Sequence, residues 1–182
     1  MAGLIHPEID SLLERTSRSF FITLRALPPK IRGQVGLLYL LARIADTIAD
    51  SKQGETEVLL QILEQYNKRV QGHSESLPDL DDLAEIQENS SEAELLRNVT
   101  SVVACLENFS EGDQNRIRKC LDIIVSGQSL DLQRFGIANE GGLISPLEHE
   151  DELDDYAYRV AGSVGEFWTQ MTLTHMFNAN AE

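Results

Sequence analysis

One helix-forming segment constrains the fold of this chain more than any other feature. Residues 31–50 place apolar side chains around most of a helical circumference and leave one narrow polar stripe. A helix that is apolar around most of its surface is buried, so the stripe is predicted to face an internal cavity rather than open water. The stripe consists of Tyr39, Arg43, Asp46 and Asp50, at about 0°, 40°, −20° and 20° on a wheel of 100° per residue.

The two aspartates of this stripe are the first candidate for chemistry. On an exposed helix their repulsion costs only about 0.2–0.5 kcal/mol, but about 6 Å apart in a cavity of effective dielectric near 20 it reaches roughly 3 kcal/mol. Either one carboxyl takes up a proton or a cation lies between them. Oxygen ligands in a wet cavity suit Mg²⁺, and Arg43 is a natural phosphate partner. The alternative is a solvated face with Arg43–Asp46 as a surface ion pair, and the spacing leaves both interpretations open.

The rest of the chain predicts one all-α domain over residues 1–182. Helical periodicity recurs throughout and strand signals are nearly absent. Pro28-Pro29 ends one helix and starts the next, and residues 136–146 (GIANEGGLISP) predict a loop. Helices are expected at 8–15, 18–26, 31–50, 55–71, 92–108, 112–135 and 150–178.

Composition narrows the classes of function. The net charge of −15 argues against a nucleic-acid partner. Cys105 and Cys120 lack a CxxC pattern and predict reduced core thiols of a cytoplasmic protein. No apolar run is long enough to cross a bilayer, and peripheral contact with a membrane is left open. Eight acids and no Lys or Arg fall between Glu75 and Glu94; this block predicts a solvated surface or, in a non-catalytic helical protein, a docking surface for a basic partner.

Two further segments each have two readings. The segment 15–21 (RTSRSFF) packs hydroxyls and two arginines into one turn and predicts either an anion site or a helix N-cap at Ser17 or Ser19. The segment 154–168 (DDYAYRVAGSVGEFW) places Tyr156 and Val160 on one stripe, beside small residues that lower helix propensity by about 1 kcal/mol per Gly. The small residues predict close approach of either a ligand or another helix, and the tyrosine alone fits a core position equally well.

Taken together and in this order, three segments resemble the squalene/phytoene synthase family: 16–21 (TSRSFF), 39–51 (YLLARIADTIADS) and 156–168 (YAYRVAGSVGEFW). The segment 127–132 (GQSLDL) resembles the helix that precedes the tyrosine segment of the family. The resemblance runs from about residue 10 to the end of the chain. It implies an all-α, isoprenoid-synthase-like helical domain around a central cavity.

The resemblance also implies an activity and a set of site residues. Family enzymes join two prenyl diphosphates head to head with Mg²⁺, and DTIAD favours a squalene synthase, which makes squalene from farnesyl diphosphate with NADPH. A phytoene or dehydrosqualene synthase, which needs no reductant, is the alternative. By resemblance, Asp46 and Asp50 bind the metal, and Tyr156 handles protons or stabilises a carbocation. The remaining implied positions are diphosphate contacts at Ser17, Arg18, Ser19 and Arg43, a cavity-lining residue at Val160 and a second cavity tyrosine at Tyr39.

The sequence departs from the family pattern in two places. Ala49 stands where the first aspartate-rich motif of the family often carries another acidic residue. This departure leaves the Asp46–Asp50 pair intact. The resemblance implies a second aspartate-rich motif downstream of the tyrosine segment, and none occurs before Glu182. We therefore expect an N-terminal portion of a longer enzyme that by itself binds metal–diphosphate weakly and turns over little. A degenerate, non-catalytic family subunit is the remaining alternative.

Overall fold

The computed structural model describes residues 5–17, 19–51, 55–139, 147 and 149–177. All regular secondary structure within those ranges is helical, which confirms the all-α prediction. The elements are α1 (Pro7–Ser17), α2 (Ser19–Ala26), α3 (Pro29–Ala49), α4 (Thr56–Gln71), α5 (Asp81–Glu85), α6 (Ser90–Arg97), α7 (Val99–Ala104), the 3₁₀ helix η1 (Cys105–Asn108), α8 (Glu111–Asn139), α9 (Glu150–Ala157), the π-helical segment η2 (Tyr158–Gly162) and α10 (Ser163–Met176).

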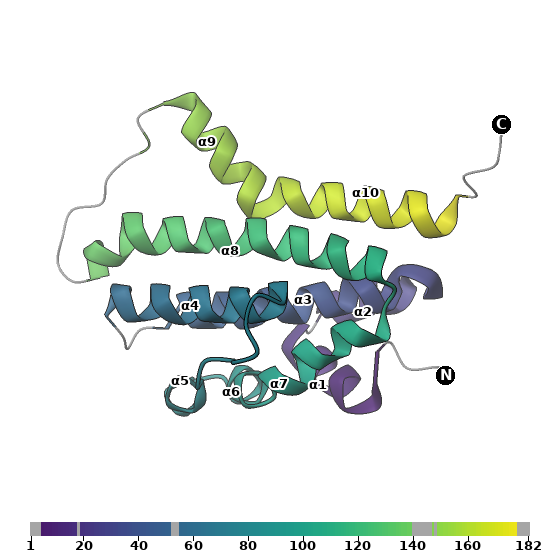
Figure 1. Cartoon of the computed structure of the whole chain (residues 1–182), viewed down its shortest axis with the longest axis horizontal. Helices are drawn as coiled ribbons and strands as arrows, with labels where there is room; N and C mark the ends of the chain where they lie inside the picture. Colours follow the sequence, from purple (N-terminus) through teal and green to yellow (C-terminus); the bar gives the residue numbers. More distant parts are fainter. Residues whose placement is uncertain (1–4, 18, 52–54, 140–146, 148, 178–182) are drawn as a thin grey trace.

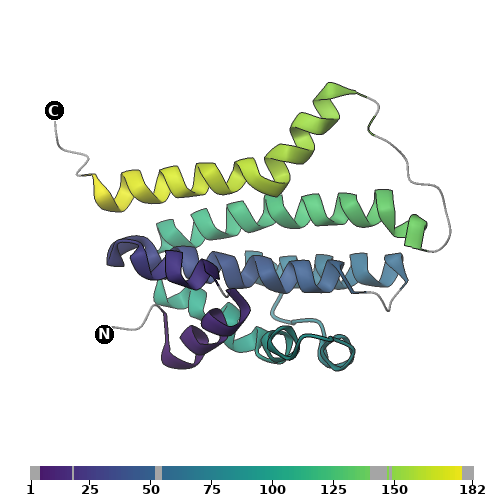
Figure 2. The same cartoon turned by 180° about the vertical axis from the view of Figure 1, so that it is seen from behind.

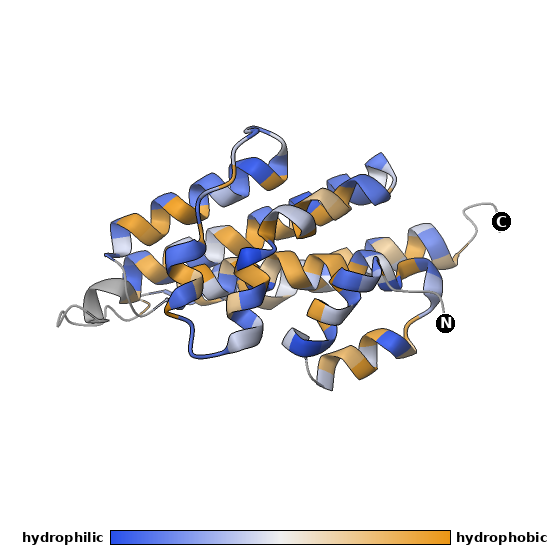
Figure 3. Cartoon of the chain, turned by 90° about the horizontal axis from the view of Figure 1, so that it is seen from below, coloured by the Kyte–Doolittle hydropathy of each residue, from blue (hydrophilic) through white to orange (hydrophobic). Residues whose placement is uncertain are grey.

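The helices stack in layers around α3 and α8. α10 runs along α8, α8 packs on both α3 and α4, and the shorter helices α1, α6 and α7 lie on the opposite side of α3 (Figures 1 and 2). α9 diverges from α8 instead of following it, which Figure 1 shows as the rising segment at the upper left. Orange and blue positions alternate around the helices in Figure 3, as expected for amphipathic helices with one face in a shared core.

α3 is the centre of this core because its sequence offers apolar side chains in almost every direction. It begins after Pro28, with Pro29 at the first helical position, where the fixed φ of a proline ring favours a helix start. Leu41 and Ile44 have no exposed surface, and the Tyr66 hydroxyl donates to the Leu41 carbonyl at 2.9 Å. A Cβ at Gly36 would lie 3.0 Å from Leu13 Cδ2, so this glycine permits close approach of α1. The predicted burial of this helix is therefore confirmed.

The far end of α10 is fastened to the start of α8 by one buried carboxylate. Asp113 is 3% exposed, and its Oδ1 lies 2.8 Å from His175 Nε2. Gln34 Nε2 of α3 donates to Asp113 Oδ2 at 3.1 Å. Burial raises the pKa of Asp113, but the hydrogen bonds from His175 and Gln34 outweigh it and leave the pKa below its ordinary value. Three helices thus meet at a charged, hydrogen-bonded carboxylate.

The helix predicted at 150–178 is two α-helices joined by a π segment. The Ser163 amide donates to the Tyr158 carbonyl five residues earlier, which widens the helix over η2. No residue of α9 or η2 is fully buried, whereas Phe167 and Met171 of α10 are. The bend between α9 and α10 in Figure 1 falls at this π segment.

Other boundaries differ from the sequence prediction for local reasons. The helix expected at 92–108 is divided into α6, α7 and η1, and at the first division the Asn98 side chain donates to the Glu94 carbonyl at 2.8 Å. The short helix α5 lies in the acidic block and was not predicted. α8 continues to Asn139, so the first part of the predicted loop 136–146 is helical.

Two simpler predictions concern the thiols and the membrane. Cys105 and Cys120 are both buried and free, as predicted. Burial, opposed by a hydrogen bond with Ser163, raises the pKa of the Cys120 thiol to about 11, which keeps it protonated. Among the described helices, none combines the length and the apolar character needed to cross a bilayer.

Candidate active site

A pocket of about 790 Å³ opens where α9 diverges from α8. α3 and α4 form one wall, α8 forms the floor, and α9, η2 and the start of α10 form the other wall. Its carboxylates come from α3, the residue that follows α3, and α8, whereas η2 and the start of α10 contribute only apolar residues. The lining comprises Ala42, Asp46, Ala49, Asp50, Ser51, Thr56, Leu59, Ile124, Gly127, Gln128, Asp131, Leu132, Phe135, Tyr156, Val160 and Val164.

Both aspartates of the α3 stripe line this pocket. The Asp46 side chain is 44% exposed and Asp50, which caps the C-terminal end of α3, is exposed, so the pocket is open to solvent here rather than enclosed. Gln128 of α8 donates its amide to Asp46 Oδ1. Partial burial, together with the charges of Asp50 and Glu92, raises the pKa of Asp46, against the lowering effects of Gln128 and Arg43.

Four polar residues of this pocket were not predicted as site residues: Thr56, and the three described next, Ser51, Gln128 and Asp131. Ser51 Oγ, Gln128 Oε1 and Asp131 Oδ1 are buried atoms without a hydrogen-bond partner among the described residues. Burial, with repulsion from Asp50, raises the pKa of Asp131 against the effect of Arg134. The segment 127–132 resembles a family helix, and its Gln128 and Asp131 are one turn apart on one face, which is the signal that could have identified them.

The donor set of the pocket fits a hydrated Mg²⁺. The described residues hold no ready-made group of three acidic, cysteine or histidine ligands. However, Asp46, Asp50 and Asp131 line one pocket, and Asp131 contributes a buried oxygen that lacks a partner. Mg²⁺ keeps several waters and is usually bound through one or two carboxylates together with substrate phosphates. Asp46 and Asp50 therefore have the chemistry to hold it without a closed protein cage.

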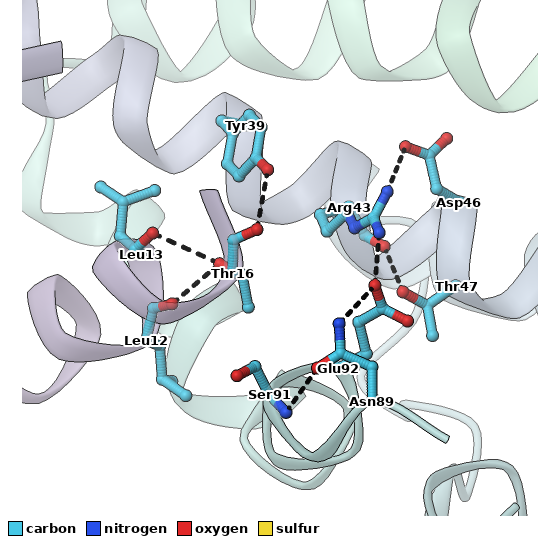
Figure 4. Close-up of polar contacts among 10 residues, drawn as sticks. All are labelled: Leu12, Leu13, Thr16, Tyr39, Arg43, Asp46, Thr47, Asn89, Ser91 and Glu92. Carbon is cyan, nitrogen blue, oxygen red and sulfur yellow. Dashed lines mark hydrogen bonds and ion pairs between the residues drawn. The ribbon is translucent and has the colours of Figure 1, made fainter. Parts of the chain in front are cut away.

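Arg43 lies beside these carboxylates but faces α6 (Figure 4). One terminal nitrogen, Nη2, contacts Glu92 Oε1, while Nη1 lies 4.0 Å from Asp46 Oδ2, at the limit of an ion pair. Arg43 Nε is buried and has no hydrogen-bond partner in the described part of the chain. Arg43 lines a second pocket of about 290 Å³, which shares Asp50 and Ser51 with the first. The Arg43–Asp46 ion pair of the alternative interpretation is thus present, at the distance limit of such a pair.

The other predicted residues near the N-terminus lie outside the first pocket. Tyr39 stacks near Phe20, with ring centroids 5.0 Å apart, and its hydroxyl donates to the Thr16 carbonyl at 3.3 Å. Ser17 is buried, and its hydroxyl donates to the Leu13 carbonyl at 2.5 Å, within its own helix. Ser19 is exposed at the start of α2. Arg18 lies outside the described residues.

Tyr156 and Val160 form the wall opposite the aspartates. Tyr156 is half-buried, and Val160 lines the pocket although it is 50% exposed. The close approach predicted from the small residues of this segment occurs instead on α8: a Cβ at Gly127 would lie 3.0 Å from Arg159 Cβ. Gly165, by contrast, has no atom within 4 Å of such a Cβ among the described residues. Arg159 Nη1 donates to Ser126 Oγ at 2.7 Å and fastens η2 to α8.

The family assignment follows from comparison with known proteins. The model of the squalene/phytoene synthase family matches residues 13–182, which include every segment that lines the pocket. The chain belongs to this family. The resemblance expected from the three ordered segments is therefore confirmed.

Individual relatives of this squalene/phytoene synthase family member are distant. Squalene synthase ERG9 of Saccharomyces cerevisiae is 26% identical over 170 residues, which cover 91% of this chain and 35% of the relative. Squalene synthase of Schizosaccharomyces pombe is 28% identical over 158 residues, which cover 85% of this chain and 31% of the relative. The chain spans about a third of the length of these curated relatives.

A solved structure supports the fold. The structure described as "The complex structure of TcSQS with ligand, E5700" superposes with a TM-score of 0.70 at 22% identity, over 90% of this chain and 43% of that chain. At this identity the likeness concerns architecture. The all-α, isoprenoid-synthase-like fold expected from the sequence is therefore the fold of the described residues.

Proposed function

We propose that this chain has the function of a Mg²⁺-dependent prenyltransferase of the squalene synthase type. The reaction is the head-to-head condensation of two farnesyl diphosphates to presqualene diphosphate, followed by reduction to squalene with NADPH. One observation carries the proposal: Asp46 and Asp50 of α3 share a pocket with Tyr156 and Val160, which come from the other end of the described chain. A structural ion pair on a solvated helix face would not require such a pocket.

The α3 wall suits the diphosphate end of the substrate. Asp46 and Asp50 would hold Mg²⁺ at the pocket mouth, and Arg43, which lines the adjoining second pocket, would attract phosphate oxygens through its charge. When bound, Mg²⁺ supplies charge neutralisation for the departing diphosphate. Gln128 orients Asp46 through its amide, which fixes one carboxylate oxygen and leaves the other turned toward Arg43.

The opposite wall suits the hydrocarbon chain. Val160 and Val164 of this wall, with Phe135 of the floor beside them, offer apolar surface that excludes water from a reacting allylic cation. The Tyr156 ring lies on the same wall, where an aromatic face stabilises positive charge and the phenol group is a candidate for proton transfer. The pocket therefore separates a polar end from an apolar end, as an amphiphilic substrate requires.

Two alternatives remain within this proposal. A phytoene or dehydrosqualene synthase would use the same pocket without NADPH. A non-catalytic family subunit would keep the fold and the pocket without turning over a prenyl diphosphate. Peripheral contact with a membrane, which the sequence leaves open, stays a prediction.

The direct test is a product assay on the protein as it occurs in its source. Farnesyl diphosphate and Mg²⁺ are supplied with and without NADPH, and the hydrocarbon product is identified by mass spectrometry. Squalene formed only with NADPH supports the proposal, and a dehydrosqualene or phytoene product supports the first alternative. Absence of any product while the protein still assembles with other chains supports the non-catalytic subunit.

The metal assignment is tested separately by Asp46→Asn. This change keeps the size of the side chain but removes the charge, so we expect Mg²⁺-dependent binding of inorganic diphosphate to weaken at least about tenfold, as for loss of a charge-assisted contact. Asp82→Asn, an exposed position in the acidic block, is the matched control and should bind like the parent chain. Equal affinity of Asp46→Asn and the parent by calorimetry would refute the assignment.

A further inference from the structure

The acidic block 75–94 divides into two kinds of carboxylate. Six of the eight acids are exposed, in agreement with the predicted solvated surface. The last two, Glu92 and Glu94 of α6, each contact an arginine far away in the sequence. Glu94 accepts two hydrogen bonds from Arg15 of α1, at 2.5 and 2.7 Å. Glu92 contacts Arg43, and this second pair adjoins the candidate metal site.

Glu92 is built into place by its own helix. Asn89, the N-cap of α6, accepts a hydrogen bond from the Ser91 amide at 3.0 Å and donates through Nδ2 to Glu92 Oε1 at 3.1 Å. The Glu92 side chain is only 18% exposed, less than the 34% of Arg43. Figure 4 shows Glu92 Oε1 between the Asn89 amide and the Arg43 guanidinium. The carboxylate is therefore oriented from one side and meets Arg43 on the other.

The position of Arg43 decides how much of Asp46 is open to a cation. With Nη2 on Glu92, Nη1 stays 4.0 Å from Asp46 Oδ2, beyond hydrogen-bond distance. Gln128 occupies only Oδ1. If Glu92 were neutral, the guanidinium would be attracted chiefly by Asp46 and would close on Oδ2 as a direct charge-assisted pair. A carboxylate engaged on both oxygens competes poorly for Mg²⁺.

We infer that Glu92 is a positioning residue that holds Arg43 away from Asp46 and so keeps Asp46 Oδ2 open to the metal. The inference rests on the proposed function, since it concerns the same metal site. It assigns to Glu92, near the end of the acidic block, a role in the metal binding proposed for the pocket. It also accounts for the orientation of the Arg43 side chain toward α6.

The test measures metal affinity directly in Glu92→Gln. Binding of Mn²⁺ is followed by the loss of the free-ion signal in electron paramagnetic resonance, and Mg²⁺ is measured by competition. We expect Glu92→Gln to weaken Mn²⁺ binding about tenfold, because the metal must then displace one charge-assisted hydrogen bond from Arg43 to Asp46. Glu94→Gln is the matched control, because it removes the same charge and the same type of arginine pair from the same helix. It should leave Mn²⁺ binding within about twofold of the parent chain.

A double-mutant cycle separates positioning from a general effect of charge. In an Arg43→Gln background, Glu92→Gln should change Mn²⁺ affinity by less than about twofold, because no guanidinium remains to close on Asp46. The same tenfold loss in both backgrounds, or equal losses in Glu92→Gln and Glu94→Gln, would overturn the inference. A parent chain that binds neither Mn²⁺ nor Mg²⁺–diphosphate would refute the proposed function and the inference together. Failure of the inference alone would leave metal binding by the parent chain intact.

Discussion

The two walls of the pocket differ in how they are held. The α3 wall belongs to a helix packed by α8, α4, α10 and the α1–α6–α7 layer, so its carboxylates project from a backbone that has little freedom. The α9–η2 wall has no fully buried residue and is fastened mainly to α8, through contacts such as Arg159–Ser126 and Arg134–Glu152. The polar end of the pocket is therefore preorganised by the core, whereas the apolar end depends on a few contacts along one helix.

The largest expected difference between the walls is in stability. Leu41→Ala removes a side chain with no exposed surface from α3 and should lower the free energy of unfolding by about 2–5 kcal/mol. Leu153→Ala makes the same chemical change on α9, where the side chain is 55% exposed, and should cost no more than about 0.5 kcal/mol. Urea unfolding followed by circular dichroism measures both. Similar losses would show that α9 contributes to the core as α3 does.

A smaller effect tests the contact between α8 and the second wall. Gly127→Ala places a methyl group 3.0 Å from Arg159 Cβ, so the cost of overpacking, about 1–3 kcal/mol, should exceed the gain in helix propensity of about 1 kcal/mol. We expect a net loss of about 1 kcal/mol in thermal or urea unfolding. Gly165→Ala, which meets no atom within 4 Å among the described residues, should instead stabilise the chain by about 0.5–1 kcal/mol. Opposite signs for the two changes are the decisive outcome; stabilisation by both would remove Gly127 as a contact point.

The smallest effect concerns the far end of the second wall, where α10 meets Asp113. The pKa of Asp113 is lowered in the folded chain, because hydrogen bonds from His175 and Gln34 outweigh the effect of burial. Folding therefore favours the charged form of Asp113. Its contribution to the free energy of unfolding is fully present above the ordinary pKa of 3.8, and it is lost as the pH falls through the lower pKa of the folded chain. Asp113→Asn has no such proton to bind, so its unfolding free energy should depend less steeply on pH below about 4. Identical acid profiles for the parent and Asp113→Asn would show that this carboxylate does not fasten α10.

The sequence was most informative where a residue's surroundings follow from its own helix. The apolar surface of residues 31–50 predicts a central helix, and the polar stripe on the same helix predicts that Asp46 and Asp50 lie together. Both predictions need only the helical period of this one segment. Tyr39 shares that stripe but contacts Thr16 and Phe20, because the stripe passes under different neighbours along its length. A helical wheel gives the angle of each side chain around the helix axis. It does not show which neighbouring helix packs against the side chain at each position along the axis.

The residues that sequence reasoning missed depend on contacts between helices. Glu92 lies in an acidic block whose average property is solvation, and only the packing of α6 against α3 distinguishes it from its exposed neighbours. Gln128 acquires a role because its amide reaches Asp46 from α8. The π segment likewise has no simple sequence signal, so 150–178 was predicted as one helix. Periodicity describes single elements well, and the pairing of side chains across elements has to come from the three-dimensional structure.

The π segment also separates the two halves of the last helix in rotational phase. One additional residue in a turn rotates everything upstream by about 100° relative to everything downstream. Tyr156 on α9 and Phe167 on α10 therefore follow different helical wheels. The face of α9 that lines the pocket can vary without moving the face of α10 that meets the core. Deletion of a single residue within 158–162 would restore one continuous wheel and turn the Tyr156 ring away from the aspartates while α10 kept its place.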